Sequence, residues 1–134
     1  MKQKIIIVLG SNYEQEKNVR YAIMELTLAF PEIAFSRMIR TEPIGMADSP
    51  QFVNAIGIAM TEKKEEHVVR ILKGIERKCG RTKEDKALGI VKLDLDLLLY
   101  GDVRHKESDW KRNYVKLLMS EMDSCSLSVN RSLP

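Results

Sequence analysis

Hydrophobic residues recur with two different periods along the first third of the chain. The segment Lys4–Leu9 is apolar without a break from Ile5 onward, which is too continuous for a half-exposed strand and predicts a buried one. Gly10-Ser11-Asn12 follows, and its residue types favour a tight turn. Apolar side chains then return every three or four residues over 14–30, which predicts an amphipathic helix. This helix should end at Pro31, because proline cannot donate the next helical hydrogen bond.

The rest of the chain predicts three more strands and two more helices. We expect strands over 33–40, 52–60 and 92–100, separated by loops at 41–50 and 81–90. A second helix carries an apolar stripe whose members are Val68, Ile71, Leu72, Ile75 and Cys79, and Gly80 suits its C-terminal cap. A last short helix is expected near 112–122, and the serine-rich residues 123–134 are expected to form a frayed tail.

The predicted order of elements is β-α-β-β-α-β. This order matches an α+β, ferredoxin-like fold, in which two helices cover one face of a four-stranded antiparallel sheet. Right-handed crossovers would put the first and third predicted strands in the centre of that sheet. The length of 134 residues fits one domain, which we expect over 1–122.

Composition and charge exclude several classes of protein. The chain is 44% hydrophobic and 31% charged, which argues against wholesale disorder. Its longest apolar runs are far shorter than the ~20 residues that span a bilayer, and no signal peptide follows Met1. The net charge of +3 is weak support for nucleic-acid binding. We therefore expect a soluble, cytoplasmic protein, monomeric rather than oligomeric, with no membrane or nucleic-acid partner and with its cysteines as free thiols.

Two acidic residues stand on the predicted strand 92–100. Alternation puts Asp94 and Asp96 on one face, ~7 Å apart along the backbone, and leucines on the other. Like charges at this spacing repel, and a divalent cation removes that cost. Ligands that are oxygen atoms only favour Mg²⁺, which commonly binds through carboxylates and phosphate oxygens. The pattern therefore indicates phosphoryl-type transfer, although two acids that keep an exposed strand face soluble would look the same.

Three other places carry candidate chemistry. Arg81 precedes a lysine-containing loop that could stabilise a phosphate, although a solvated helix end has the same composition. Gly10-Ser11-Asn12 resembles a phosphate-binding turn but lacks the usual glycine patterns. Asn54 and Phe52 share one face of a strand, where an amide and a ring could hold a flat heterocycle, or could simply lie at the edge of the core.

Taken together, these places resemble the family of 6-hydroxymethyl-7,8-dihydropterin pyrophosphokinases of folate biosynthesis. The resemblance runs in unbroken order over about residues 1–102. The segments that carry it are Leu9-Gly10-Ser11-Asn12, Arg40-Thr41-Glu42-Pro43-Ile44-Gly45, Gln51-Phe52-Val53-Asn54-Ala55, Ile75-Glu76-Arg77-Lys78-Cys79-Gly80-Arg81 and Leu93-Asp94-Leu95-Asp96-Leu97-Leu98-Leu99-Tyr100-Gly101. Family members have the ferredoxin-like fold, which agrees with the order of elements.

The resemblance implies transfer of pyrophosphate from ATP to the pterin hydroxymethyl group, giving AMP. Asp94 and Asp96 would bind two Mg²⁺ ions, and with Arg81 they would form the catalytic set. The positions that match the pterin pocket are Thr41, Ile44, Phe52 and Asn54. The positions that match the nucleotide side are Glu76, Arg81 and Leu97.

The chain departs from the family in the loop and beyond Tyr100. Leu88 stands where the family has a tryptophan that caps the pterin, and Val91 where it has an arginine that binds phosphates. Lys92 should point to the other side and cannot form a bidentate fork. The family's C-terminal histidine has no counterpart, and Tyr114 is the candidate for its stacking aromatic residue. These departures leave open an active enzyme, a degenerate relative that binds pterin but transfers poorly, and a ferredoxin-like regulatory domain.

Overall fold

The computed structural model describes residues 1–42, 51–80 and 82–132, with side chains described as far as Asp123. Within these residues the strands form one antiparallel sheet of six strands. The strands are β1 (Gln3–Ser11), β2 (Ala34–Phe35), β3 (Ile39–Thr41), β4 (Phe52–Thr61), β5 (Asp94–Tyr100) and β6 (Val103–Arg104). The helices are α1 (Gln15–Ala29), α2 (Glu65–Lys78), α3 (Lys83–Ala87), α4 (Glu107–Trp110) and α5 (Asn113–Ser132).

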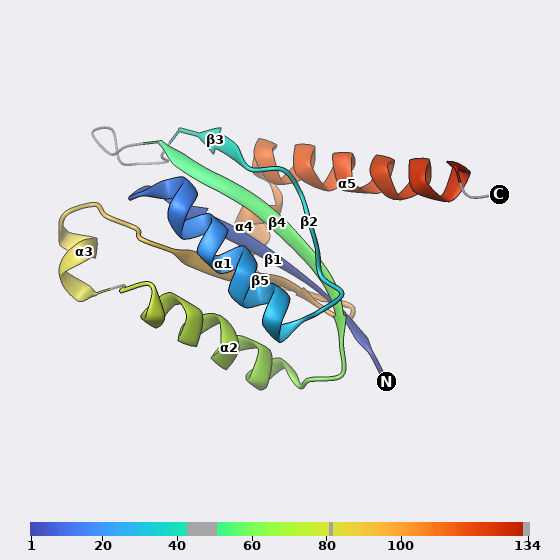
Figure 1. Cartoon of the computed structure of the whole chain (residues 1–134), viewed down its shortest axis with the longest axis horizontal. Coiled ribbons are helices and arrows are strands. Elements are labelled where there is room, and N and C mark those ends of the chain that lie inside the picture. Colours follow the sequence, from blue (N-terminus) through green and yellow to red (C-terminus); the bar gives the residue numbers. More distant parts are fainter. Residues whose placement is uncertain (43–50, 81, 133–134) are drawn as a thin grey trace.

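The sheet has the order β2-β4-β1-β5-β6, with β3 also paired to β4. The first and third predicted strands, which are β1 and β4, therefore lie in its centre, as the sequence predicted. Figure 1 shows α1 and α2 across one face of the sheet. The protein is thus an α+β protein with an antiparallel sheet, consistent with the predicted arrangement.

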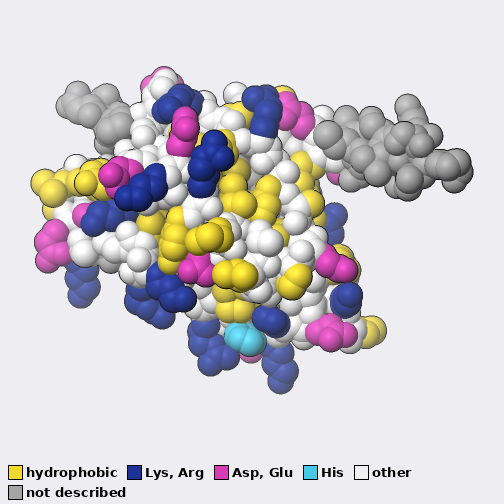
Figure 2. Space-filling model, in the orientation of Figure 1, with side chains coloured by type: hydrophobic (Ala, Val, Ile, Leu, Met, Phe, Trp, Pro, Cys, Tyr) yellow, Lys and Arg dark blue, Asp and Glu magenta, His cyan; other side chains and the backbone are white. Residues whose placement is uncertain are grey.

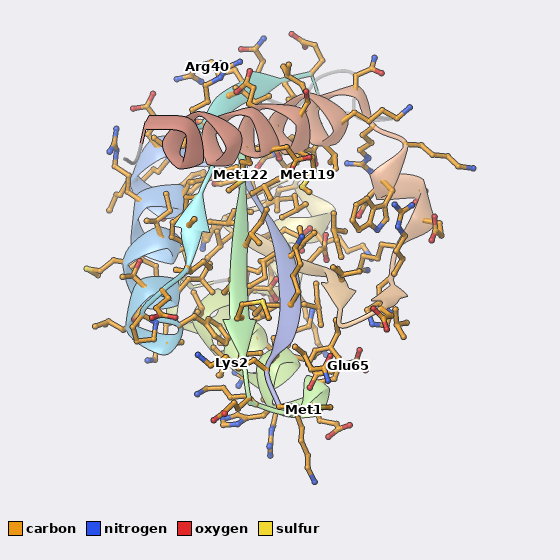
Figure 3. The ribbon with its side chains drawn as sticks, turned by 90° about the vertical axis from the view of Figure 1, so that its right-hand side faces the viewer. Met1, Lys2, Arg40, Glu65, Met119 and Met122 are labelled. Carbon is orange, nitrogen blue, oxygen red and sulfur yellow. The ribbon has the colours of Figure 1, made fainter. Side chains whose placement is uncertain are left out.

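The central strand β1 is buried on both faces, which explains its unbroken run of apolar residues. Ile5, Ile7 and Leu9 pack in a core cluster with residues of α1 and α2. Ile6 and Val8 pack in a second cluster with residues of α5. In Figure 3 the sheet lies between α1 and the α4–α5 segment, and Met119 and Met122 of α5 point toward it. Helices thus cover both faces, whereas the sequence had predicted cover on one face only.

Two predicted elements differ from the structure. The expected strand over 33–40 is two short strands, because Ser36 interrupts the ladder with β4: Ile56 N–H donates to the Ser36 side chain (2.8 Å). The expected loop 81–90 contains the helix α3, whose first turn is fixed because Thr82 N–H donates to the Asp85 carboxylate (3.0 Å). Both differences arise from side-chain to backbone hydrogen bonds, which a hydrophobic pattern does not reveal.

The C-terminal helix is longer than the sequence predicted. The last helix begins at Asn113 and continues to Ser132, beyond the expected end at 122. Gly80 adopts φ +91 directly after α2, the left-handed geometry expected of a glycine cap. Cys79 is a free, partly buried thiol whose pKa is raised by burial. In the described part of the chain, no helix has both the length and the apolar character that crossing a membrane requires.

Candidate active site

The two aspartates of β5 lie on one face of the sheet, as alternation predicted. Leu93, Leu95 and Leu97 are buried on the other face, against α1 and α2. Asp94 and Asp96 instead line a cavity of about 710 Å³. The residues that line this cavity come from segments far apart in the sequence: Val8, Gly10, Thr41, Glu42, Phe52, Asn54, Val91, Asp94, Asp96, Asp109, Lys111, Arg112, Asn113 and Tyr114.

Strand register brings Asp94 and the Asn54 amide to one row of the sheet. Asp94 pairs with Gly10 of β1, and Gly10 pairs with Asn54 of β4. Neighbouring strands lie ~4.8 Å apart, so Asp94 and Asn54 face each other across about 10 Å with only a glycine between them. A Cβ at Gly10 would lie 2.8 Å from Asn54 Oδ1 and 3.7 Å from the Phe52 ring. Gly10 therefore forms the floor of the cavity, a role that its interpretation as a turn residue missed.

The Asn54 side chain is buried and oriented by its neighbour on β3. Asn54 is 4% exposed, and its amide nitrogen donates to the Thr41 hydroxyl (2.5 Å). The pairing of Ile39–Thr41 with Phe52–Asn54 holds these side chains at one end of β4. Thr41, Phe52 and Asn54 all line the cavity, so three of the four positions predicted to bind the substrate meet there. The fourth, Ile44, lies outside the described residues.

The two carboxylates of the acid pair are close enough to disfavour each other's charged form. Burial raises the pKa of Asp96 to about 7, helped by charge repulsion from Asp94 and by a hydrogen bond that the protonated Asp96 donates to Asp94. The Lys106 ammonium, 3.7 Å from Asp96 Oδ1, opposes this shift without cancelling it. A partly buried carboxylate beside another carboxylate is the environment in which a bound cation releases the most repulsion.

The donor set fits a hard divalent cation. Both aspartates offer oxygen atoms, and no group of three or more His, Cys, Asp or Glu side chains suited to a metal occurs among the described residues. Two carboxylates would leave most coordination positions to water and phosphate oxygens. This is how Mg²⁺ usually binds in sites that handle nucleotides, and it argues against a closed structural zinc site.

The opposite wall of the cavity comes from the junction of α4 and α5. Arg112 lies 3.3 Å from the Asp109 carboxylate and lines the cavity beside Tyr114. Burial raises the pKa of Tyr114, while Arg112 lowers it through its charge and a hydrogen bond. The sequence pointed to Tyr114 but to no role for Arg112, since it predicted neither the α4 helix nor the place of that helix over the sheet.

A second cavity of about 450 Å³ adjoins the first at Asp96. Its apolar lining is Val69, Leu72, Leu95 and Leu97, and its polar lining is Glu65, Lys73, Asp96, His105 and Lys106. Leu97, predicted for the nucleotide side, therefore lies next to the acid pair. Glu76 lines neither cavity. Its buried carboxylate accepts the Leu95 N–H (2.7 Å), which ties α2 to β5.

The loop between α2 and β5 is fastened to the end of β1. Asn12 donates to Gly89 O (2.8 Å) and accepts from Val91 N (2.6 Å). This fixes Val91, which lines the larger cavity, whereas Leu88 at the loop tip is 72% exposed. Lys92 turns away from the cavity, as predicted, and donates to Gly80 O (3.0 Å). Arg81 lies outside the described residues.

Known proteins similar to this chain point to one protein family. The model of the 7,8-dihydro-6-hydroxymethylpterin-pyrophosphokinase family matches residues 6–124. A folate synthesis bifunctional protein of Arabidopsis thaliana is 31% identical over 126 residues, which cover 84% of this chain and 25% of that protein.

Two bacterial relatives are similar at the same level. The 2-amino-4-hydroxy-6-hydroxymethyldihydropteridine pyrophosphokinase of Pseudomonas aeruginosa is 32% identical, covering 76% of this chain and 64% of the relative. The protein of the same name from Porphyromonas gingivalis is 28% identical, covering 88% and 89%. The chain thus spans a quarter of the plant protein and under two thirds of the Pseudomonas protein.

Proposed function

The chain belongs to the 7,8-dihydro-6-hydroxymethylpterin-pyrophosphokinase family, and we propose that it transfers pyrophosphate from ATP to the hydroxymethyl group of 6-hydroxymethyl-7,8-dihydropterin. The reaction releases AMP and belongs to folate biosynthesis. One observation carries this proposal: the carboxylates of Asp94 and Asp96 and the amide of Asn54 face a single cavity across Gly10. We also infer that the α+β fold is ferredoxin-like, since its sheet order has β1 and β4 in the centre.

The pterin side of the site is the end of β4. An amide both donates and accepts hydrogen bonds, so Asn54 can match the alternating polar edge of a pterin ring. Thr41 holds that amide in place. Phe52 from β4 and Tyr114 from α5 supply aromatic surface to the same cavity, which suits a flat heterocycle. Ile44 is assigned to this pocket from the family resemblance.

The acid pair is the metal side. We propose that Asp94 and Asp96 hold two Mg²⁺ ions through their carboxylate oxygens. When bound, such ions would supply positive charge that stabilises the transferring group. The aspartates themselves fix where the acceptor and the phosphates meet, about one strand away from the pterin floor at Gly10.

The nucleotide side is the smaller cavity at Asp96. Its leucines and Val69 suit the apolar faces of a nucleoside base, so Leu97 would contact the base. Glu76 would act as a positioning residue, because its carboxylate holds the backbone of β5 at Leu95 between the two aspartates. Arg81 is assigned as a phosphate-binding cation from the family resemblance, and Arg112 can supply a second positive charge from the wall of the larger cavity.

Release of AMP tests the proposal directly. The purified 134-residue chain is incubated with ATP, the pterin alcohol and Mg²⁺, and AMP is quantified by chromatography. We expect AMP only when all three are present, and chelation of the metal should abolish it reversibly. A protein that binds pterin in calorimetry but yields no AMP above background would instead be a binding relative. Val91 in the cavity, where the family has arginine, is the feature that would explain that result.

A further inference from the structure

A lysine adopts a left-handed backbone conformation at the edge of the nucleotide-side cavity. Lys106 has φ 53 and ψ 59, which residues with a Cβ rarely adopt. Such strain persists only where the surroundings fix the backbone on both sides, and it often occurs where a side chain has to be aimed.

The main chain fixes Lys106 from both directions. Before it, β6 pairs with the end of β5, and His105 N–H donates to Leu98 O (2.9 Å). After it, Asp109 N–H donates to Lys106 O (2.8 Å), which closes the first turn of α4. The left-handed residue is therefore the corner between the sheet edge and α4.

Side chains reinforce this corner. The Trp110 indole N–H reaches both His105 O (3.0 Å) and Leu98 O (3.2 Å). The Arg104 guanidinium lies 4.3 Å from the centre of the Trp110 ring. His105 Nε2 lies 2.6 Å from the Glu65 carboxylate, which joins the corner to the start of α2. Figure 3 shows Glu65 at the far end of the molecule from α5.

The corner directs the lysine ammonium to the place where the two cavities meet. Lys106 Nζ lies 3.7 Å from Asp96 Oδ1, and Asp96 lines both cavities. The lysine side chain is 52% exposed, so it can move to a ligand without unpacking the core. A phosphate chain that runs from a base in the smaller cavity to the acid pair has to pass this ammonium.

We propose that Lys106 binds the phosphate chain of the nucleotide between the apolar cavity and the acid pair. The assignment rests on the proposed function and gives it a cation from the described residues, where the loop carries Val91 in place of an arginine. A triphosphate carries about four negative charges, and two divalent ions balance about four, so the charge of the two aspartates remains to be met. Divalent ions on Asp96 would repel the Lys106 ammonium from that carboxylate and toward the phosphate oxygens.

Three substitutions separate this role from a merely structural one. Lys106→Met keeps the length of the side chain and the backbone strain but removes the charge. Lys106→Gly removes both the charge and the strain, since glycine adopts positive φ freely. Lys106→Arg retains the charge. Lys116→Met, on an exposed position of α5, is the matched control for the loss of one positive charge.

Calorimetric titration of each protein with a non-hydrolysable ATP analogue and Mg²⁺ is the test. We expect Lys106→Met and Lys106→Gly to bind the analogue at least about tenfold more weakly, a difference that shrinks as salt is raised. Lys106→Arg should stay within about threefold of the wild type, and Lys116→Met should be unchanged. The thermal midpoint of Lys106→Gly should equal or exceed that of the wild type, which shows that lost affinity is not lost folding.

The outcomes distinguish two failures. A wild-type protein that binds the analogue while Lys106→Met binds it equally well overturns the assignment of Lys106 alone. Equal weakening in Lys106→Met and Lys116→Met also overturns it, because the effect would then come from net charge. A wild-type protein that binds no analogue refutes the proposed function together with this assignment.

Discussion

The candidate site has two halves that are built in different ways. The sheet half consists of Gly10, Thr41, Phe52, Asn54, Asp94 and Asp96, which occupy paired positions on neighbouring strands. The junction half consists of residues 82–92 and 103–114, which belong to short helices, turns, the two-residue strand β6 and the start of α5. Backbone ladders hold the first half, whereas individual side chains such as Asn12 and Trp110 hold the second.

This difference explains where the chain agrees with its family and where it departs. In a paired strand, a shift of one residue would move every side chain to the other face, so the chemistry of the sheet half is bound to its register. Segments held by a few side chains tolerate changes in length and composition. The departures that the family resemblance implies, at Leu88, Val91 and the segment after Tyr100, all lie in the junction half. Figure 2 shows acidic and basic side chains interspersed over one face of the molecule.

Removing a carboxylate from the sheet half should have the largest effect. Asp94→Ala and Asp96→Ala should each lower the rate of AMP formation by about 10³-fold or more, because each removes one of the carboxylates that we propose as metal ligands. Pterin binding should change much less, because Asn54 and Phe52 remain in place. Asp102→Ala, in the exposed turn after β5, is the control. A variant at Asp94 or Asp96 that keeps a tenth of the wild-type rate would contradict the assignment of the metal side.

Adding a methyl group at Gly10, on the floor of the cavity, should have the next largest effect. Gly10→Ala puts a Cβ 2.8 Å from Asn54 Oδ1, which forces the amide to move. We expect pterin affinity to fall by about 30-fold, since misplacing one buried polar contact costs ~2 kcal/mol. Fluorescence or calorimetric titration with the pterin measures the change.

Gly74→Ala is the matched control for that prediction. A Cβ there approaches no closer than 4.0 Å to a neighbour, the Arg77 guanidinium. In the interior of α2 this change should stabilise the protein by ~0.5–1 kcal/mol and leave pterin affinity unchanged. Equal pterin affinity in Gly10→Ala and the wild type would show that the ring does not lie over β1.

Restoring a cation to the junction half should have a smaller effect. Val91→Arg adds a guanidinium to the wall of the larger cavity, at a backbone position that Asn12 already fixes. We expect AMP formation to rise by about tenfold, because an added donor near the transferring group stabilises its charge. Leu117→Arg, on the exposed side of α5, adds the same charge elsewhere and should have no effect. A loss of activity in Val91→Arg would mean that this chain uses the space at residue 91 in another way.

The sequence predicted the sheet half better than the junction half for the same physical reason. Alternation on β5 gave the common face of Asp94 and Asp96, and the apolar run of β1 gave its burial, because both follow from the geometry of one strand. The role of Gly10 could not be predicted in this way. It depends on Asn54 lying opposite in the paired strand, a contact between residues far apart in sequence.

The junction half depends on features that no short pattern encodes. The helix α3 and the corner at Lys106 are each fixed by a few hydrogen bonds, among them Thr82 to Asp85 and Trp110 to Leu98. A composition of lysines, acids and one tryptophan is compatible with a loop as well as with these turns. The residue types nevertheless predicted a polar region here, and Tyr114 and Leu97, which the family resemblance singled out, each line a cavity.

The smallest expected effect is on the stability of the folded protein, through Asp96 in the sheet half. Burial raises the pKa of Asp96 to about 7 in the folded chain, against an ordinary value of 3.8. The folded state therefore binds more protons than the unfolded state between these values, and the stability that this contributes is present below about pH 4 and lost as the pH rises through 7. Asp96→Asn lacks this titration. Its thermal midpoint at pH 8 should exceed that of the wild type by roughly 2–5 °C, and the two midpoints should converge near pH 4.

The effect of Mg²⁺ on the thermal midpoints of the two proteins is the control for this prediction. Addition of Mg²⁺ at pH 8 should raise the midpoint of the wild type, because a cation relieves the repulsion between Asp94 and Asp96, and should leave that of Asp96→Asn almost unchanged. The Lys106 ammonium is a monovalent partner at 3.7 Å and does not relieve that repulsion fully. If the wild type were the more stable protein at pH 8 without the metal, the ion pair with Lys106 would outweigh burial, and the acid pair would be a stabilising feature of the fold rather than a cost carried for the reaction.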